Sequence, residues 1–381
     1  MSSTPDTPSS KNVAVIGGGI LGVSTAVHLQ REGASVVLIT ETELASGASG
    51  RSLSWLNSAG IRSDAYHALR VAGIDRYRTM FAANPHLEWL RFDGGVYWSD
   101  ADSEASTLAR HRYEKEHAYG SRLVDSARIP RVVPGIAADS VPGSAIYNPG
   151  DGWVSLPHLI EHLAAELVSR GGRIVTQAGK ASVLVNDRRA TGVSTTAGER
   201  YEADAVVVAC GPSTPAVVGE LGVRIDDGSP LSMLVTTEPL EHDIKAVLNT
   251  PRAATRPNPG GTLAIDHDWY VDQIIEGPDG NCSIPECAIQ QLLDEASALL
   301  EGSPKLKAAE YKLGRKPIPG DGEPVFGELE KVPGCYVAFS HSGATVGLIA
   351  GELLADEIMS GRPHPMFRSF RPERFSERKL T

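Results

Sequence analysis

The amino-terminal part of the chain contains a strand, a tight glycine turn and the start of a helix. Residues 13–16 read Val-Ala-Val-Ile, an apolar run typical of a buried parallel strand. Gly17, Gly19 and Gly22 follow it with the spacing G-x-G-x-x-G. We expect Gly17 to make the sharp turn, Gly19 to leave room for a pyrophosphate, and Gly22 to let the helix pack closely on its strand. The pattern predicts a parallel sheet with crossover helices and a dinucleotide at the turn.

The context of the glycines strengthens this prediction, since a G-x-G-x-x-G match alone also fits an ordinary structural turn. An amphipathic helix follows the turn, and a second apolar strand covers 35–39. Ile20 and Leu21 would form the first turn of the helix, where unpaired N–H groups and the positive end of the dipole face the phosphates. We therefore favour dinucleotide binding over a purely structural turn.

The segment after the second strand bears on which dinucleotide is bound. In NAD-binding folds an acidic residue about 20 positions beyond the glycines binds the ribose, and this place falls on Thr40 and Glu41. A loop of small and polar residues follows over 45–52. It either approaches a second phosphate and the ribityl chain of a longer cofactor or is a flexible surface loop. The candidate ligands of this loop are Ala48, Ser49, Arg51 and Ser52.

Composition excludes several classes of partner. The formal net charge of −11 over 381 residues argues against binding to nucleic acid, whose phosphates need a basic face. No apolar run approaches the roughly 18 residues that span a bilayer, and no basic cluster indicates a membrane surface. Residues 1–11 are expected to be a disordered leader without a signal peptide, which predicts a cytoplasmic protein with free thiols. The spacing of the cysteines does not fit a metal site, so we predict none.

Two kinds of pattern alternate along the chain. Strand and helix signals alternate over 12–82, 150–224 and 311–381, and the apolar strand 205–209 runs into Cys210 and Gly211. Short alternating strands and polar helices fill 83–149 and 225–310. We therefore predict an α/β fold with two discontinuous domains. The first is Rossmann-like, and the second is α+β with a mostly antiparallel sheet that two separate insertions build.

Several segments form a joint pattern: the turn at Gly17–Gly22, the loop Ala48–Ser52, the strand end Val206–Gly211, residues 320–327, the strand and glycine segment 336–343 with the helix after it, and the tail 370–375. Over nearly its whole length the chain thereby resembles the FAD-dependent amino acid oxidase family, whose members include D-amino acid oxidase, glycine oxidase and monomeric sarcosine oxidase. The resemblance implies that the Rossmann-like domain binds FAD and that the second domain binds the substrate. No Cys or His occupies the family's attachment positions, which implies non-covalent FAD.

The resemblance also implies places for individual residues. The last helix would point its N-terminus at the pyrimidine end of the flavin, where charge develops on reduction. The residues expected there are His341, Ser342, Gly343, Ala344 and Thr345. Lys180 is expected near the adenine, and Cys210 and Gly211 at the edge of the cofactor site.

Two positions depart from the family pattern. Thr40 stands where the family commonly has Glu, with Glu41 one residue later. Lys316 stands directly before Pro317, where an Arg often binds the substrate carboxylate, and Arg315 precedes it. Because neighbouring strand residues point to opposite faces, we expect only one of the two to face the flavin. The proposed catalytic residues are Lys316, Arg315 and His341, and the substrate candidates are Arg51, Trp55, Tyr66, Arg256 and Lys316.

The resemblance implies an oxidoreductase that takes a hydride from a C–H next to an amine nitrogen of a small molecule, with oxygen as the acceptor. The substrate would be a D-amino acid, glycine, sarcosine or another secondary amine. Three alternatives stay open: a flavin dehydrogenase that uses a quinone or protein acceptor, a flavin-binding subunit of a heteromeric oxidase, and an NAD-dependent dehydrogenase. A non-amino-acid substrate and a homo-oligomer also remain open.

Overall fold

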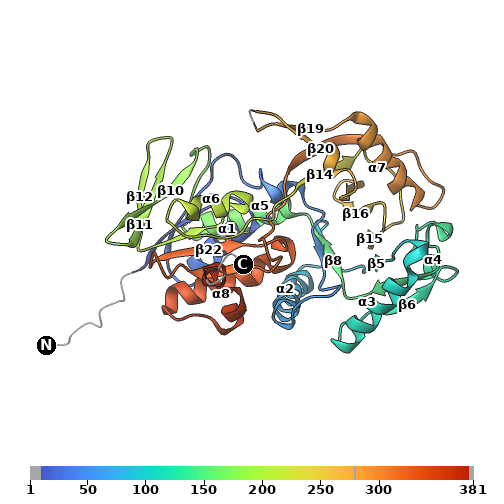
Figure 1. Ribbon diagram of the computed structural model, residues 1–381, viewed down its shortest axis with the longest axis horizontal. Helices are drawn as coiled ribbons and strands as arrows, with labels where there is room; N and C mark the ends of the chain where they lie inside the picture. The colour runs from blue at the N-terminus through green and yellow to red at the C-terminus, as the bar shows by residue number, and fades with distance from the viewer. Residues whose placement is uncertain (1–9, 279, 377–381) are drawn as a thin grey trace.

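The structure is a computed structural model that describes residues 10–278 and 280–376, so positions 1–9 of the expected leader lie outside the described residues. Within this part of the chain, no helix is both long and apolar enough to cross a membrane. The chain forms two large sheets with helices packed on them (Figure 1).

The first sheet has six strands. Their bounds are β1 (Asn12–Ile16), β2 (Ser35–Ile39), β9 (Arg173–Val175), β13 (Ala205–Val208), β21 (Val325–Glu328) and β22 (Cys335–Phe339). The order is β21-β22-β13-β1-β2-β9, and all pairs are parallel except β21 with β22. β1, β13 and β22 consist almost wholly of apolar residues, and this composition suits central strands whose two faces are both buried by helices and loops.

Helices on this sheet come from distant parts of the sequence. The helices of the described chain are α1 (Ile20–Arg31), α2 (Asp64–Ala83), α3 (Glu104–Glu116), α4 (Ile129–Val132), α5 (Leu156–Ser169), α6 (Thr214–Gly219), α7 (Glu286–Ala298) and α8 (Gly343–Ser360). α1 packs against α5 and α8, and α2 packs against α8. α2 approaches the start of α8 closely, because a Cβ on Gly73 would lie 2.2 Å from the Thr345 carbonyl oxygen. This contact joins the amino-terminal and carboxy-terminal parts of the chain.

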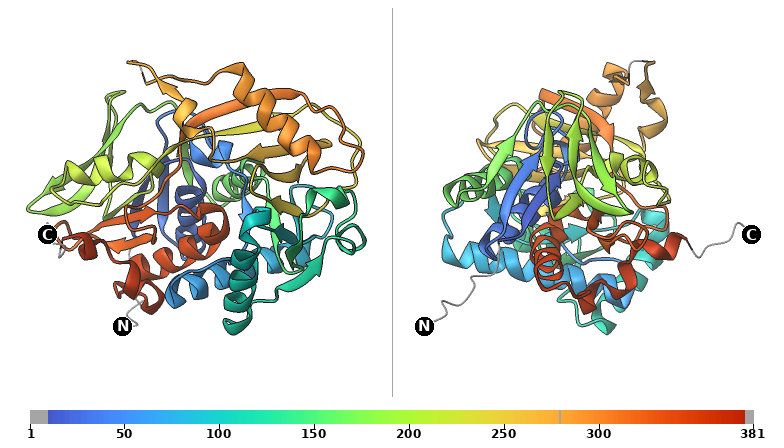
Figure 2. Two further views of the ribbon diagram at one scale, coloured as in Figure 1. Left: turned by 45° about the vertical axis from the view of Figure 1, so that its right-hand side comes forward. Right: turned by 90° about the vertical axis from the view of Figure 1, so that its left-hand side faces the viewer.

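The second sheet has eight strands in the order β20-β14-β17-β16-β15-β5-β7-β6. Their bounds are β5 (Gly95–Tyr97), β6 (Arg122–Asp125), β7 (Ser144–Asn148), β14 (Leu231–Thr237), β15 (Val247–Asn249), β16 (Ala254–Asn258), β17 (Thr262–Asp266) and β20 (Ala308–Arg315). Only β5 and β15 pair in parallel, which joins the two insertions in one sheet. In Figure 2, left, the teal and orange segments of these insertions lie together on one side of the molecule.

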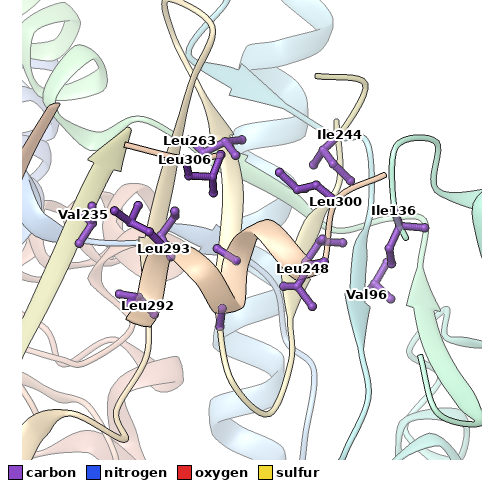
Figure 3. Close-up of a cluster of buried hydrophobic side chains, with 14 of the residues drawn as sticks. Val96, Ile136, Val235, Ile244, Leu248, Leu263, Leu292, Leu293, Leu300 and Leu306 are labelled. Atoms are coloured by element: carbon purple, nitrogen blue, oxygen red, sulfur yellow. The ribbon is translucent and has the colours of Figure 1, made fainter. Parts of the chain in front are cut away.

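A separate hydrophobic core supports the second sheet. Leu292 and Leu293 of α7 lie close to Val235 of β14 and Leu263 of β17, and all four side chains are buried (Figure 3). The architecture confirms the predicted fold class, a Rossmann-like α/β part and a mostly antiparallel α+β part. β20 begins before the expected boundary at 310/311, and the division into domains stays a prediction.

Three smaller sheets complete the described chain. Their strands are β3 (Trp55–Leu56), β4 (Leu90–Arg91) and β8 (Gly152–Val154); β10 (Ala181–Asn186), β11 (Arg189–Thr195) and β12 (Arg200–Glu202); and β18 (Ile275–Glu276) and β19 (Cys282–Ser283). β10, β11 and β12 form an antiparallel meander. β4 was expected in the mostly antiparallel sheet of the second domain. Instead it takes no part in the eight-stranded sheet and pairs with β8, which pairs with β3 on its other side.

Candidate functional site

A cavity of about 1400 Å³ lies between the two large sheets. The residues that directly follow β1, β2, β13 and β22 line one part of it, so the carboxyl ends of four strands of the first sheet face the cavity. The ends of β17 and β20 line the other part. Sites for a single small ligand typically occupy about 300–1,000 Å³, so this cavity has room for a dinucleotide together with a substrate.

The glycine turn lies at the wall of the cavity. Gly17 has a φ of +120°, and a Cβ there would lie 2.2 Å from the Ala209 carbonyl oxygen. A Cβ on Gly22 would lie 2.0 Å from the Gly17 carbonyl oxygen, so Gly22 brings α1 close to its strand and does not itself line the cavity. Gly19 has an extended backbone, with φ −84° and ψ 177°, and a Cβ there would meet only Ser49 Oγ at 3.2 Å. Of the three glycines of the motif, only Gly19 could carry a Cβ without meeting backbone atoms.

The loop after β2 runs beside this turn. It contains the short 3-10 helix η1 (Ala48–Arg51), and the Ile20 N–H at the start of α1 donates to Ser49 Oγ at 3.0 Å. The four predicted ligands of the loop all line the cavity: Ala48, Ser49, Arg51 and Ser52. Arg51 Nε is buried and has no hydrogen-bond partner within the described chain. A phosphate or carbonyl oxygen of a ligand would satisfy this donor.

The remaining predicted cofactor residues also border the cavity, which brings together Ile20, Leu21, Thr40, Glu41, Lys180, Cys210, Gly211, His341, Ser342, Gly343, Ala344 and Thr345. Thr40 is buried, and its side chain faces Gly18, whose Cβ would lie 2.8 Å from Thr40 Oγ1. Glu41 is exposed to the cavity and is the carboxylate at the end of β2. Burial raises the pKa of the Cys210 thiol to about 12, so this residue stays protonated.

These features fit the FAD that the sequence predicts. They include an open approach at Gly19, two helix N-termini at one cavity, and the unpaired buried donor on Arg51. Residues that would hold the diphosphate and ribose are those of the turn, the Ala48–Ser52 loop and Glu41. α8 would face the ring system. No group of three or more metal-ligating side chains gathers anywhere in the described ranges.

His341 is exposed toward the cavity from the loop between β22 and α8. The walls of the cavity limit its hydration, and the resulting desolvation, with the nearby charges of Lys316, Arg70 and Arg62, lowers the pKa of His341 to about 4. The imidazole is therefore neutral at physiological pH. It can donate or accept a hydrogen bond, but it carries no charge and is a weak base.

Both cations of the predicted carboxylate site are paired within the protein. Lys316 Nζ lies 2.9 Å from Asp266 Oδ2 at the end of β17, and Arg315 Nη2 lies 2.5 Å from Glu276 of β18. Both residues line the same cavity, and which of them faces the flavin stays a prediction. β20 ends at Arg315, so the alternation of strand side chains does not extend to Lys316.

The substrate candidates do not all reach the cavity. Trp55 lines it, whereas Tyr66 and Arg256 do not. Tyr66 Oη donates to Ser342 Oγ at 2.6 Å from behind the start of α8. The buried Arg256 guanidinium donates to the carbonyl oxygens of Leu53 and Pro257, which directs it into the interior.

The sequence motifs did not indicate two arginines at the cavity wall, Arg62 and Arg70. Arg62 Nε is buried without a hydrogen-bond partner in the described chain, and burial, with the neighbouring charge of Arg70, lowers the pKa of Arg62 to about 10. Arg70 donates to Asn57 and to Ser342. Arg62 lies just before α2, and Arg70 lies within it. In the sequence α2 has the pattern of an ordinary amphipathic helix, so only an unusual number of arginines there could have indicated these two residues.

A family model described as FAD-dependent oxidoreductase matches residues 12–357. Glycine oxidase of Geobacillus kaustophilus (strain HTA426) is 25% identical over 370 residues, which cover 91% of this chain and 92% of that protein. One of the subunits of the opine oxidase of Agrobacterium tumefaciens (strain Ach5) is 21% identical over 380 residues, covering 96% and 97%. The structure of an L-amino acid deaminase from Proteus vulgaris superposes with a TM-score of 0.82 at 20% identity, covering 98% of this chain and 96% of that one.

Proposed function

Because the chain belongs to the FAD-dependent oxidoreductase family, we propose that it oxidises a C–H bond next to an amine nitrogen of a small molecule. FAD, when bound, would supply the redox chemistry as the hydride acceptor, with oxygen as the final electron acceptor. The observation that carries the proposal is the single cavity that joins the glycine turn and the start of α8 to the polar ends of β17 and β20. The proposed substrates are D-amino acids, glycine- or sarcosine-like compounds and other secondary amines.

The charges around the cavity favour the form of the amine that can react. An amine must lose its proton before the C–H beside it can leave as hydride. Arg62 and Arg70 act electrostatically on the His341 ring, and neither pairs with a carboxylate within the described ranges, so this part of the cavity is positive. Nearby positive charge lowers the pKa of an amine, so the site favours the neutral amine. His341 is neutral and orients the substrate by a hydrogen bond.

Lys316 is the proposed anchor for an anionic group of the substrate. Its ammonium carries three N–H donors, and the contact with Asp266 uses one of them. Asp266 also accepts a hydrogen bond of 2.7 Å from Tyr270 Oη, so the carboxylate that positions Lys316 is itself fixed. Arg315 is more exposed, with 44% of its side chain accessible against 28% for Lys316, and its partner Glu276 is also on the surface. We propose a secondary role for Arg315.

Two alternatives within flavin chemistry remain. The protein is then either a dehydrogenase that passes electrons to a quinone or protein, or the flavin-binding subunit of a heteromeric oxidase. The similarity to one of the subunits of opine oxidase supports the second alternative.

Anaerobic reduction of the flavin tests the proposal. The purified holoprotein is mixed without oxygen with D-amino acids, N-methyl amino acids, simple amines and, as controls, the corresponding hydroxy acids. We expect the visible flavin band to bleach with at least one amine and with none of the hydroxy acids. Readmission of air should restore the band and release hydrogen peroxide. Bleaching by hydroxy acids alone would overturn the proposal, and bleaching without peroxide would favour the dehydrogenase.

A further inference from the structure

The residue that precedes α8 has an unusual hydrogen-bonding arrangement. Ser342 is the N-cap residue, but its side chain makes no capping hydrogen bond. Instead, its hydroxyl oxygen accepts hydrogen bonds from Tyr66 Oη, at 2.6 Å, and from Arg70 Nη1. An N-cap serine ordinarily accepts from an N–H of the first helical turn. Two buried donors of α2 therefore hold the Ser342 hydroxyl away from the helix that it would cap.

This arrangement leaves the N-terminus of α8 open toward the cavity. The first intrahelical bond runs from the Val346 N–H to the Ser342 carbonyl oxygen, at 2.9 Å. The N–H groups of Gly343, Ala344 and Thr345 come before it and have no intrahelical acceptor. All three residues line the cavity. The donors that a serine cap would partly satisfy stay available for a bound ligand.

Arg70 also brings an uncompensated positive charge to the same place. It is only 3% exposed, it lines the cavity, and its guanidinium donates to the carbonyl and side-chain oxygens of Asn57 as well as to Ser342. All of these acceptors are neutral. Within the described ranges no carboxylate pairs with Arg70, whereas Lys316, Arg315 and Arg110 at the same cavity each have an acidic partner. A buried cation without a counter-ion is costly unless an anion comes to it.

We propose that Arg70, together with Tyr66, is a positioning residue that keeps the N-terminus of α8 uncapped and adds buried positive charge beside the pyrimidine edge of the flavin. That edge gains negative charge when the flavin is reduced. The free N–H groups and the helix dipole stabilise this charge directly, and Arg70 acts through Ser342 and through its own field. This role of Arg70 rests on the bound flavin of the proposed function and is the same whichever substrate is oxidised.

Sulfite binding and the midpoint potential of the holoprotein test this proposal. Sulfite adds to oxidised flavin and leaves negative charge on the ring, so its affinity reports the positive field without any substrate. Charges several ångströms apart in a protein interact strongly enough that Arg70→Met should weaken sulfite binding by about tenfold or more. The same tenfold change in the relative stability of reduced flavin makes the two-electron midpoint potential about 30 mV more negative.

Arg256→Met is the matched control. Arg256 is also 3% exposed and has no carboxylate partner in the described chain, but it lies outside the cavity lining. This variant should have the sulfite affinity and potential of the wild type. If Arg70→Met also has wild-type values, or if both variants change equally, the proposal is overturned.

Two further variants keep the proposal testable if Arg70→Met does not retain flavin. Arg70→Lys keeps the charge, so it should bind sulfite within a few-fold of the wild type, and a full loss of sulfite affinity in this variant would refute the electrostatic role. Tyr66→Phe removes one of the two donors that hold the Ser342 hydroxyl and leaves all charges in place. We expect a smaller weakening of sulfite binding from it, and no change would show that Tyr66 has no part in positioning.

Discussion

A buried carboxylate behind the cavity wall should make the stability of this protein depend on pH. Asp151 is fully buried, and it accepts hydrogen bonds from the Trp55 indole N–H, at 3.0 Å, and from the Tyr119 hydroxyl. Burial raises the pKa of Asp151 from 3.8 to about 7, and the negative charge of Glu114 adds to this rise, while the two hydrogen bonds and Arg110 oppose it. Asp151→Asn removes the ionisable group and keeps the shape of the side chain.

The sign follows from the direction of the pKa change. The unfolded chain loses the Asp151 proton near pH 4, whereas the folded protein holds it until about pH 7. The contribution of this proton to stability is therefore complete below pH 4 and is lost as the pH rises through the folded value. Each pH unit of the interval is worth about 1.4 kcal/mol, so the wild type loses about 4 kcal/mol across it. The amide stays neutral, so it mimics the protonated acid and avoids this loss.

Urea unfolding of both holoproteins at pH 5, 6, 7 and 8, followed by far-ultraviolet circular dichroism, measures the difference. The free energy of unfolding of Asp151→Asn, relative to the wild type, should increase by about 2 kcal/mol from pH 5 to 7 and level off by pH 8. Asp356→Asn, which removes an exposed carboxylate on α8, is the control and should show no such trend. A difference between Asp151→Asn and wild type that is constant over this range would refute the reasoning.

Three other predictions concern the cofactor and the substrate. Gly19→Val should abolish FAD binding while the apoprotein keeps its melting temperature. Gly17→Ala should instead destabilise the fold itself, since its Cβ would lie 2.2 Å from a carbonyl oxygen. A Gly19→Val protein that is fully loaded with FAD would show that the pyrophosphate binds elsewhere. Acid precipitation should release the FAD into the supernatant, and flavin fluorescence that stays with the denatured chain would show a covalent bond instead. If the substrate is a carboxylate, Lys316→Ala should lose on the order of 2–5 kcal/mol of kcat/KM and Arg315→Ala much less; small and equal losses would indicate a neutral substrate.

Several features of the fold and of the site could be predicted from the sequence because they depend on neighbouring residues. The apolar run before Gly17 predicts a buried strand from its own residues, whichever strands it pairs with. The spacing of the glycines predicts the turn that follows. The last helix was expected directly after the segment 336–343 and covers Gly343–Ser360. In each case a short stretch of chain carries the whole signal, since hydrogen bonds and packing within it decide the local conformation.

The charge pattern of the cavity could not be predicted in this way. The sequence singled out Lys316 and Arg315 as cations but did not indicate that Asp266 and Glu276 neutralise them. The same limit applies to Arg256, which resembled a substrate ligand and is directed into the interior by backbone carbonyl groups. Residue type alone does not reveal which partner a charged side chain meets.

The sequence by itself determined that the chain builds a parallel sheet with a glycine turn for a dinucleotide, and that a helix begins after His341. Only the tertiary structure decided which side chains meet at that helix. Arg70 and Ser342 are 272 positions apart and come together because α2 packs against the start of α8. Local hydrogen bonding and hydrophobic periodicity are encoded by near neighbours, whereas the field in a cavity depends on which distant charges the folded chain brings together.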